Sequence, residues 1–228
     1  MRTALVIGGT SGIGRAIAGA LAAQGSRVVA AGRPPFEESQ PGVGAVEVDV
    51  RDASSIQRVV ETFDSIDVLV YAAGVIRRRE ELDPGVFEEV VDVNLGGAAR
   101  VCAACRPRMA RGSSVVLIGS LFSTLGAGHA PAYAASKGGL VQLAKSLALA
   151  WAPDGIRVNA LAPGWIATAF TRPLTADPAR NAAILARTPL GRWGTPEDVV
   201  GPALFLASDA AAFVTGVLLP VDGGYLCT

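Results

Sequence analysis

Residues 4–14 read Ala4-Leu5-Val6-Ile7-Gly8-Gly9-Thr10-Ser11-Gly12-Ile13-Gly14, a short apolar run followed by a glycine-rich loop. The next residues, Arg15–Gln24, have the pattern of a helix, so the loop joins a first strand at Ala4–Ile7 to a first helix. Glycines at 8, 12 and 14 let the backbone approach a ligand closely, and the N-terminus of a helix favours an anion. The stretch therefore predicts a pyrophosphate-binding turn at the start of an α/β fold.

Short β-branched runs alternate with longer helical patterns along the chain, which is typical of β-α-β units and a parallel sheet. Further strands are expected at Arg27–Ala31, Ala45–Asp49, Asp67–Tyr71, Ser114–Ile118, Arg157–Ala162 and Leu218–Val221. Further helices are expected at about Pro84–Met109, Tyr133–Trp151 and Pro196–Ala207, with a long irregular stretch before Pro189. At 228 residues we expect one domain, 1–228, with a Rossmann-type, doubly wound parallel sheet of about seven strands.

The connection between the second and third strands is unusually short. It spans only Gly32–Gly44 and contains Pro34, Pro35 and Pro41. A right-handed crossover needs about a dozen residues and usually carries a helix. Because prolines in these positions oppose a helix, we predict a stunted or absent helix and a thinly covered flank of the sheet.

The composition is that of a globular protein. Half of the residues are hydrophobic, 18% are charged, and 20 Lys and Arg balance 20 Asp and Glu. Zero net charge does not favour nucleic acid or an acidic membrane as a partner. The N-terminal apolar run is too short for a signal-peptide core, and no apolar run approaches the roughly 20 residues of a membrane span. We expect a cytoplasmic protein.

Cys102 and Cys105 form a single C-x-x-C pair, a pattern found in redox and zinc sites. Redox pairs usually start a helix, and a zinc site needs further ligands. This pair lies inside an Ala-rich helical stretch of a chain with only one histidine. Buried structural thiols are the favoured interpretation, and no metal site is predicted.

Tyr133 and Lys137 are four residues apart in a predicted helix, so their side chains share a face. A free phenol has a pKa of about 10, and a neighbouring cation lowers that pKa. Tyr133 is therefore a candidate to exchange a proton with an alcohol or carbonyl oxygen. Because this spacing is common in helices, the prediction depends on the rest of the chain.

Together these features resemble the short-chain dehydrogenase/reductase family along nearly the whole chain. The matching fragments are G-x-x-x-G-I-G at 8–14, Asp49-Val50, Ala73-Gly74, Asp92-Val93-Asn94, Ser120, Tyr133-x-x-x-Lys137, Pro163-Gly164, Thr168 and Val221-Asp222-Gly223-Gly224. The resemblance implies an NAD(P)(H)-dependent oxidoreductase that interconverts a secondary alcohol and a ketone.

The resemblance also implies four catalytic residues. Tyr133 would be the general acid or base, and Lys137 would lower its pKa and hold the nicotinamide ribose. Ser120 would bind the reacting oxygen, and Asn94 would bend its helix and hold a water in the proton relay. From the residues alone, Ser120 could instead cap the following loop, and Asn94 could be an ordinary helix amide.

A cofactor shell follows from the same resemblance, with the pyrophosphate at the glycine loop and the nicotinamide near Tyr133. The implied residues are Gly8, Ser11, Gly12, Ile13, Gly14, Arg33, Asp49, Val50, Ala73, Gly74, Tyr133, Lys137, Pro163, Gly164, Ile166 and Thr168. Where the family usually has Asn-Asn-Ala-Gly, this chain has Tyr71-Ala72-Ala73-Gly74. We therefore expect a looser or differently braced glycine loop.

Cofactor choice depends on the end of the second strand. Ala31-Gly32-Arg33 lacks a carboxylate to repel a phosphate, and the Arg33 guanidinium is able to bind one. The sequence thus slightly favours NADP(H), although Arg33 could instead stack on adenine or face solvent.

Substrate contacts are expected from loops at the carboxyl ends of the strands. Arg77 and Arg78 could bind a substrate carboxylate, or belong to a solvated charge run. His129 is expected beside the substrate or simply exposed. Trp165 would face the ligand from a substrate lid at about 163–190, or take part in ordinary packing.

Four fragments resemble the 2-dehydro-3-deoxy-D-gluconate 5-dehydrogenase (2-deoxygluconate 3-dehydrogenase) and gluconate 5-dehydrogenase subgroup, which implies a sugar acid or polyol as substrate. These fragments are Gly74-Val75-Ile76-Arg77-Arg78, Ala162–Thr168, Gly191-Arg192-Trp193-Gly194 and Val221–Tyr225. The apolar stretch Phe213–Tyr225 resembles the family's tetramer-forming strand and tail, so a homotetramer is expected, with a dimer second.

Two other functions remain open. A 3-oxoacyl-thioester reductase shares the fold and the catalytic residues, but a carrier-protein substrate should need a basic docking patch, which zero net charge does not favour. A dinucleotide sensor would bind the cofactor without turnover, but it has no need of Asn94, Ser120, Tyr133 and Lys137.

Overall fold

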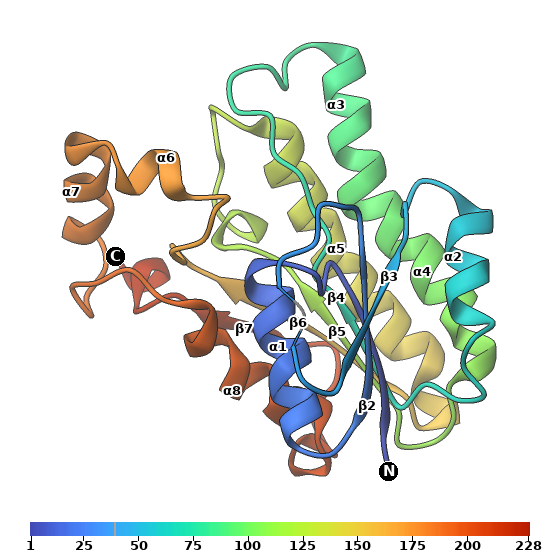
Figure 1. Cartoon of the computed structure of the whole chain (residues 1–228). Coiled ribbons are helices and arrows are strands. Elements are labelled where there is room, and N and C mark those ends of the chain that lie inside the picture. Colours follow the sequence, from blue (N-terminus) through green and yellow to red (C-terminus); the bar gives the residue numbers. More distant parts are fainter. Residues whose placement is uncertain (39) are drawn as a thin grey trace.

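The centre of the molecule is a parallel sheet of seven strands in the order β3-β2-β1-β4-β5-β6-β7 (Figure 1). The computed structural model describes residues 1–38 and 40–228. Its strands are β1 (Thr3–Ile7), β2 (Arg27–Gly32), β3 (Val43–Glu47), β4 (Val68–Tyr71), β5 (Ser114–Ile118), β6 (Arg157–Pro163) and β7 (Leu218–Val221). Strand order reverses between β1 and β4, and open α/β sheets bind ligands at such a point. The predicted fold class is confirmed.

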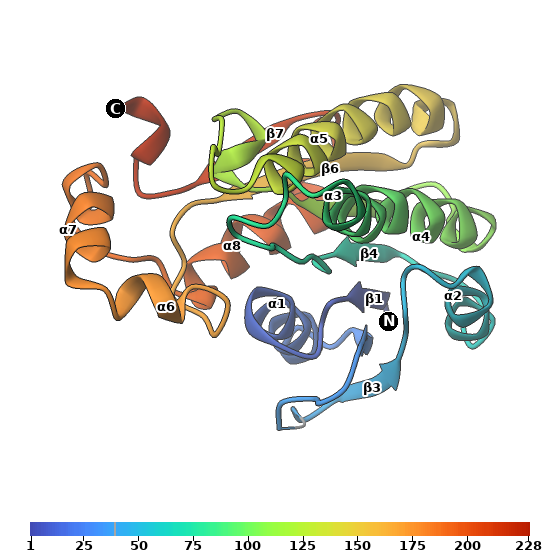
Figure 2. The ribbon, with the colours of Figure 1, turned by 90° about the horizontal axis from the view of Figure 1, so that it is seen from above.

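Helices cover both faces of this sheet. In chain order they are α1 (Gly12–Ala23), α2 (Ala53–Val60), α3 (Pro84–Val91), α4 (Gly97–Cys105), α5 (Pro131–Trp151), α6 (Arg172–Thr175), α7 (Pro178–Ala186) and α8 (Pro196–Ala207). Figure 2 shows α4 and α5 on one side of β4 and α1 on the other. Among the helices of the described residues, none combines the length and apolarity needed to cross a membrane.

Alternate residues of β1 belong to the two hydrophobic cores, one on each face of the sheet. Ala4 and Val6 pack with α1 and α8, whereas Leu5 and Ile7 pack with α2, α4 and α5. All four are essentially inaccessible to solvent. Because helices cover both faces, the strand is apolar throughout instead of alternating with polar residues. This explains why the first stretch of the sequence reads as an uninterrupted apolar run.

The short connection between β2 and β3 contains no helix in its described residues, which confirms the prediction from its prolines. It lies against α1, where the Arg15 guanidinium donates two hydrogen bonds to the Glu38 carbonyl, at 3.1 and 3.3 Å. Strand β3 is the edge of the sheet, and Gly44, Ala45 and Glu47 in it are exposed. The described residues of this connection thus form no second helix, and this flank is thinly covered.

Three helices were not predicted from the sequence pattern. α2 follows β3, and its N-cap Asp52 accepts a hydrogen bond from the Ser54 amide. α6 and α7 occupy the stretch before Pro189 for which the sequence predicts no regular structure, and Asp177 caps α7. α6 and α7 stand out from the sheet at its carboxyl end (Figure 1). Strand β3 also begins two residues before its predicted start, because Val43 pairs with Val28.

The long helix predicted from Pro84 is interrupted by a π-helical turn at Asp92–Gly96. Asn94 in this turn is fully buried. Its Oδ1 accepts from the Val75 amide at 2.8 Å, and its Nδ2 donates to the Val75 carbonyl at 2.9 Å and to Ser136 Oγ at 3.0 Å. Tyr71, the last residue of β4, donates its phenol hydrogen to the Val93 carbonyl at 2.6 Å. The turn is thus tied to β4, to the segment after it and to α5.

Gly97 leaves the space that the Tyr71 phenol occupies. A Cβ at position 97 would lie 2.5 Å from Tyr71 Oη and 2.8 Å from Val50 Cγ2. We predict that Gly97→Ala lowers the free energy of unfolding by about 1–3 kcal/mol through overpacking, measured by urea denaturation. Gly138→Ala in α5 is the matched control, because its Cβ would find its nearest contact at 3.7 Å, the Ser123 carbonyl oxygen. That variant should lose no stability, and equal losses in both variants would contradict the explanation.

Candidate active site

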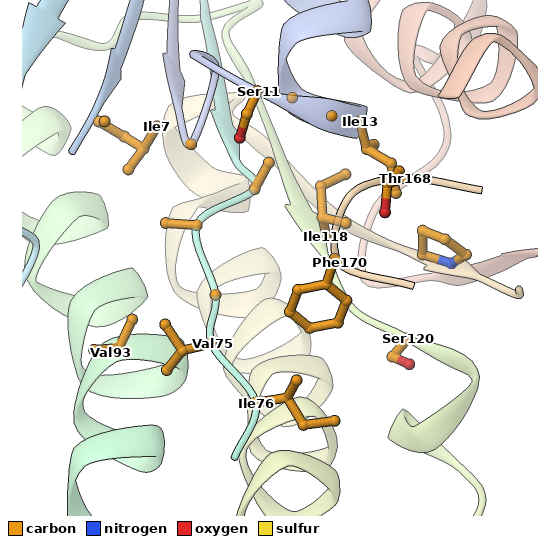
Figure 3. Close-up of a pocket in the computed structure, with 18 of the residues that line it drawn as sticks. Ile7, Ser11, Ile13, Val75, Ile76, Val93, Ile118, Ser120, Thr168 and Phe170 are labelled. Carbon is orange, nitrogen blue, oxygen red and sulfur yellow. The ribbon is translucent and has the colours of Figure 1, made fainter. Parts of the chain in front are cut away.

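A cavity of about 500 Å³ opens at the carboxyl ends of the central strands. Figure 3 shows Ser11 and Ile13 at the start of α1, Ile76 on the segment after β4, Ser120 after β5, and Thr168 and Phe170 after β6. A cavity of this size is within the range of sites for small molecules and cofactors. Every residue predicted for the cofactor shell lines it.

The glycine loop packs directly against the end of β4. Gly8 has a φ of 77°, and a Cβ there would lie 2.5 Å from the Ala73 nitrogen. A Cβ at Gly14 would overlap the Gly8 carbonyl and lie 3.1 Å from the Ala72 methyl. Backbone hydrogen bonds from Gly8 to Ala31 and from Ala72 to Ile7, both at 2.7 Å, hold the same corner. Where the family usually has an amide side chain, close backbone packing therefore braces this loop.

The first turn of α1 fits the pyrophosphate of a dinucleotide. Gly12, Ile13 and Gly14 open the helix and line the cavity, and Ser11 is its N-cap. Backbone amides at a helix N-terminus and the helix dipole both favour an anion. A Cβ at Gly12 would find its nearest neighbour, the Thr168 methyl group, at 3.7 Å. Thr168 therefore approaches the glycine loop from the segment after β6.

Two arginines line the cavity just after β2 and β3. Arg33 was predicted there, whereas Arg51 was not. The Arg51 amide, Nε and Nη2 donate to the Asp49 carboxylate at 2.9, 3.0 and 2.6 Å. The hydrogen bonds from the Arg51 side chain lower the pKa of Asp49 to about 2. The Asp49 carboxylate is therefore paired with Arg51, and the Arg33 guanidinium lies beside the same cavity.

Tyr133, Lys137 and Ser120 lie together at the other end of the cavity. Lys137 Nζ is 5.6 Å from the centroid of the Tyr133 ring and donates to the Ile118 carbonyl at 2.7 Å. Ser120 Oγ accepts from the Phe122 amide at 3.2 Å, so this hydroxyl also caps the short helical turn Leu121–Ser123. All three side chains are buried and line the cavity. The structure thus brings together three of the four predicted catalytic residues.

Burial dominates the pKa values of this group. It raises the pKa of Tyr133, while Ser120 and Arg78 act in the opposite direction. It lowers the pKa of Lys137 to about 8. The net pKa of Tyr133 is therefore raised, because loss of hydration disfavours its charged form, and the expectation that Lys137 lowers this pKa stays a prediction. A neutral phenol is the form that can donate a proton to a carbonyl oxygen.

Asn94 lies behind Lys137 instead of on the cavity wall. A Cβ at Gly74 would lie 3.3 Å from Asn94 Oδ1 and 3.5 Å from Lys137 Nζ. Gly74 therefore allows both side chains to approach the backbone closely. The Asn94 side chain is occupied by Val75 and Ser136, and its role in a proton relay stays a prediction.

Arg78 and Trp165 line the cavity, as predicted for substrate contacts. The Arg78 guanidinium lies 5.5 Å from the centroid of the Phe170 ring, and Trp165 packs edge-on against Phe122 with ring centroids 5.8 Å apart. Within the described residues, Arg78 Nε and Trp165 Nε1 are buried and have no hydrogen-bond partner. Buried donors are nearly always paired, so these two are candidates to bind a ligand.

Arg77 and His129 lie outside the residues that line this cavity. Arg77 Nη2 lies 2.9 Å from a carboxylate oxygen of Glu89. The positive charge that was expected to bind a substrate carboxylate is therefore paired with Glu89. His129 packs edge-on against Phe122 with ring centroids 5.7 Å apart, and burial lowers its pKa. The structure therefore does not bring these two predicted substrate residues into the site.

Several residues of the cavity wall were missed from the sequence, among them Thr10, Glu37, Arg51 and Phe122. Among these, Phe122 packs its ring edge-on against Tyr133 and Trp165 within the cavity wall and against His129 outside it. Its only signal in the sequence was its position two residues after Ser120. Similarly, Thr10 lies within the glycine loop and Arg51 follows Asp49 by two residues.

The C-x-x-C pair takes no part in this site. Cys102 and Cys105 are buried free thiols on α4. Burial raises the pKa of Cys102 to about 12 and also raises the pKa of Cys105. A protonated thiol is a poor nucleophile and metal ligand, so the structural interpretation of the pair is confirmed.

Comparison with known proteins agrees with this geometry. Residues 8–226 match the family profile described as enoyl-(acyl carrier protein) reductase. The chain is 38% identical to the 2-dehydro-3-deoxy-D-gluconate 5-dehydrogenase of Pseudoalteromonas atlantica, over 99% of this chain and 96% of the relative. The chain belongs to the short-chain dehydrogenase/reductase family. This membership confirms the resemblance predicted from the sequence and makes the protein an oxidoreductase that acts on CH–OH groups.

Two further relatives have names that give two different activities. A crystal structure from Beutenbergia cavernae, with a proposed activity of NAD(P)-dependent gluconate 5-dehydrogenase and with bound NADP at low occupancy, is 42% identical. It has a TM-score of 0.91, covering 100% of this chain and 97% of that chain. The 3-oxoacyl-(acyl-carrier-protein) reductase of Escherichia coli is 37% identical over 98% of this chain and 96% of the relative.

Proposed function

We propose that this short-chain dehydrogenase/reductase uses NAD(P)(H) to interconvert a secondary alcohol and a ketone on a small sugar acid. The observation that carries the proposal is one cavity in which a glycine loop and helix N-terminus lie at one end and Tyr133, Lys137 and Ser120 at the other. The relative from P. atlantica, a sugar-acid dehydrogenase by name, supports the substrate class.

A bound nicotinamide dinucleotide would supply or accept the hydride. The glycine loop would bind its pyrophosphate through backbone amides at the start of α1. Tyr133 would donate its proton to the carbonyl oxygen in reduction and accept one from the hydroxyl in oxidation. Ser120 would hydrogen-bond the same oxygen. Lys137, 5.6 Å from the Tyr133 ring, would stabilise the phenolate left after reduction and bind the ribose.

Arg78 and Trp165 support an acidic, hydroxylated substrate. The guanidinium of Arg78 suits a carboxylate, and the indole N–H of Trp165 suits a hydroxyl. We further propose that residues 163–190, which carry Trp165 and Phe170 on the cavity wall, form a substrate lid. A second candidate function, reduction of a 3-oxoacyl thioester, is favoured by the 37% identity to the E. coli reductase.

For the assembly we propose a homotetramer formed through β7. This strand is the edge of the sheet opposite β3, and the neighbouring Phe213 and Val217 are exposed apolar residues. Pairing through such an edge would bury both. The cytoplasmic location stays a prediction from the sequence.

Tyr133→Phe tests the proposed function. The change keeps the ring and removes the hydroxyl, so kcat should fall by about 100- to 10,000-fold, while the dinucleotide Kd stays within about threefold. Turnover is measured by the absorbance of the reduced cofactor over a panel of sugar acids, polyols, ketones and 3-oxoacyl thioesters. Tyr225→Phe is the matched control, because that buried tyrosine packs on Trp165 through its ring. Full activity of the Tyr133 variant would show that the proton donor is another group.

Substitution of Arg78 and substitution of its neighbour Arg77 should have different effects on KM. Arg78→Ala should raise KM for a sugar acid by about 10- to 100-fold, as expected for a lost charged hydrogen bond. A neutral polyol or ketone of similar size should be affected much less. Arg77→Ala is the matched control, because Glu89 holds that guanidinium. If Arg78→Ala affects acid and neutral substrates equally, the carboxylate is bound elsewhere.

Arg33 should decide the choice between the two dinucleotides. Because its guanidinium would bind the 2′-phosphate, Arg33→Ala should lower kcat/KM for NADP by about 10-fold or more and leave the value for NAD nearly unchanged. Kinetics with both cofactors and a single substrate provide the measurement. A wild-type protein with a strong preference for NAD would contradict this assignment.

A further inference from the structure

Glu81 is a carboxylate on the segment between β4 and α3 that is 0% exposed. A charged group is rarely buried to this extent unless it is paired or hydrogen-bonded. Its two oxygens accept hydrogen bonds from two backbone amides. Oε1 accepts from Arg77 at 2.7 Å, and Oε2 accepts from Tyr133, 52 residues away, at 2.8 Å. A single side chain thus bridges the arginine run and the backbone of the residue that we propose as proton donor.

At Tyr133, Glu81 supplies the cap that α5 lacks. Ala130 occupies the N-cap position of this 21-residue helix and makes no side-chain cap bond among the described residues. The first turn of a helix has free amide hydrogens, and a negative charge there is stabilised by the helix dipole. The Glu81 carboxylate meets both conditions because it binds the Tyr133 amide in this turn.

At Arg77, the same carboxylate completes a second connection to α5. Asn94 already holds Val75 through both its amide and its carbonyl, and Asn94 Nδ2 also donates to Ser136 on α5. The segment 75–81 is therefore attached to α5 at two points, through Asn94 and through Glu81. Arg78 lies between these two points and lines the cavity.

We propose that Glu81 is a positioning residue that joins the Arg78 segment to Tyr133, so that the substrate-binding group and the proton donor keep a fixed separation. The proposal rests on the proposed function, in which Tyr133 is the proton donor and Arg78 contacts the substrate. Nothing in it requires the substrate to be an acid, because the contacts of Glu81 are to backbone amides.

The charge of Glu81 also acts on Tyr133. The titratable groups beside this phenol are Lys137 on α5 and Arg78 and Glu81 on the segment after β4. Titratable groups on the neighbouring elements are His129 in the loop before α5, Glu89 on α3 and Arg180 on α7. Glu89 is paired with Arg77, and Arg180 with Asp177. Arg78 lowers the pKa of Tyr133, whereas Glu81 raises it.

The test is Glu81→Gln in the full chain. Glutamine has one acceptor oxygen, so one of the two amides loses its partner, and kcat should fall by about 10- to 100-fold with the dinucleotide Kd within about twofold. Alcohol oxidation needs deprotonated Tyr133, so its rate rises with pH. Because loss of the negative charge lowers the pKa of the phenol, this rise should move to lower pH in the variant.

Two further variants make the result decisive. Glu80→Gln is the matched control, since Glu80 is the exposed neighbour, and it should behave as wild type. Glu81→Asp keeps the charge but is one methylene shorter, so kcat should fall while the pH profile stays in place. If Glu81→Gln does not fold, Glu81→Asp still tests the proposal, because a wild-type kcat in Glu81→Asp would overturn it. A lower kcat in Glu81→Gln with an unmoved pH profile would also overturn it.

Tyr133→Phe separates this proposal from the proposed function. If Tyr133→Phe is inactive and Glu81→Gln has wild-type kinetics, the function stands and the role of Glu81 is wrong. If Tyr133→Phe turns over normally, the failure lies in the choice of proton donor.

Discussion

The contact on which the site depends is the close approach of Gly8 to the backbone of Ala72 and Ala73. It joins the loop after β1 to the segment after β4, the two strands between which the strand order reverses. A side chain at position 8 would separate them, since its Cβ would lie 2.5 Å from the Ala73 nitrogen. The segment that starts at this contact continues through Val75 to Glu81, where it is attached to α5. One stretch of backbone therefore connects the cofactor loop to the catalytic helix.

The sequence predicted those features that depend on a few consecutive residues. An apolar strand followed by glycines has one main interpretation, and the prolines between β2 and β3 excluded a helix by their covalent structure. The helices α2 and α7 escaped prediction because they have only 8 and 9 residues, fewer than the roughly 10 to 12 that distinguish a helix from another short apolar pattern. Their one local signal was a capping aspartate, Asp52 and Asp177, before each helix.

Within the site, motifs located the residues but did not give their surroundings. Arg77 and Arg78 are equivalent in the sequence, and only the structure distinguishes them, by pairing Arg77 with Glu89, 12 residues away, and placing Arg78 on the cavity wall. The direction of the pKa change at Tyr133 could not be predicted from the sequence either, because it depends on burial by residues from several elements. Glu81 is the clearest case, since nothing in a run of charges indicates that one member is buried on an amide 52 residues away.

The charges around Tyr133 connect the proposed binding of substrate by Arg78 to the proposed proton transfer. Burial alone would leave a phenol of raised pKa beside an ammonium of lowered pKa. Lys137 donates a hydrogen bond to the Ile118 carbonyl, and further charges that act on the pKa of the phenol come from Arg78 and Glu81. If Arg78 binds the acid group of a substrate, part of its positive charge is neutralised and its effect on Tyr133 weakens. The pKa of the phenol would then rise on binding, which favours the protonated form that reduction requires and couples acid recognition to the proton-transfer step.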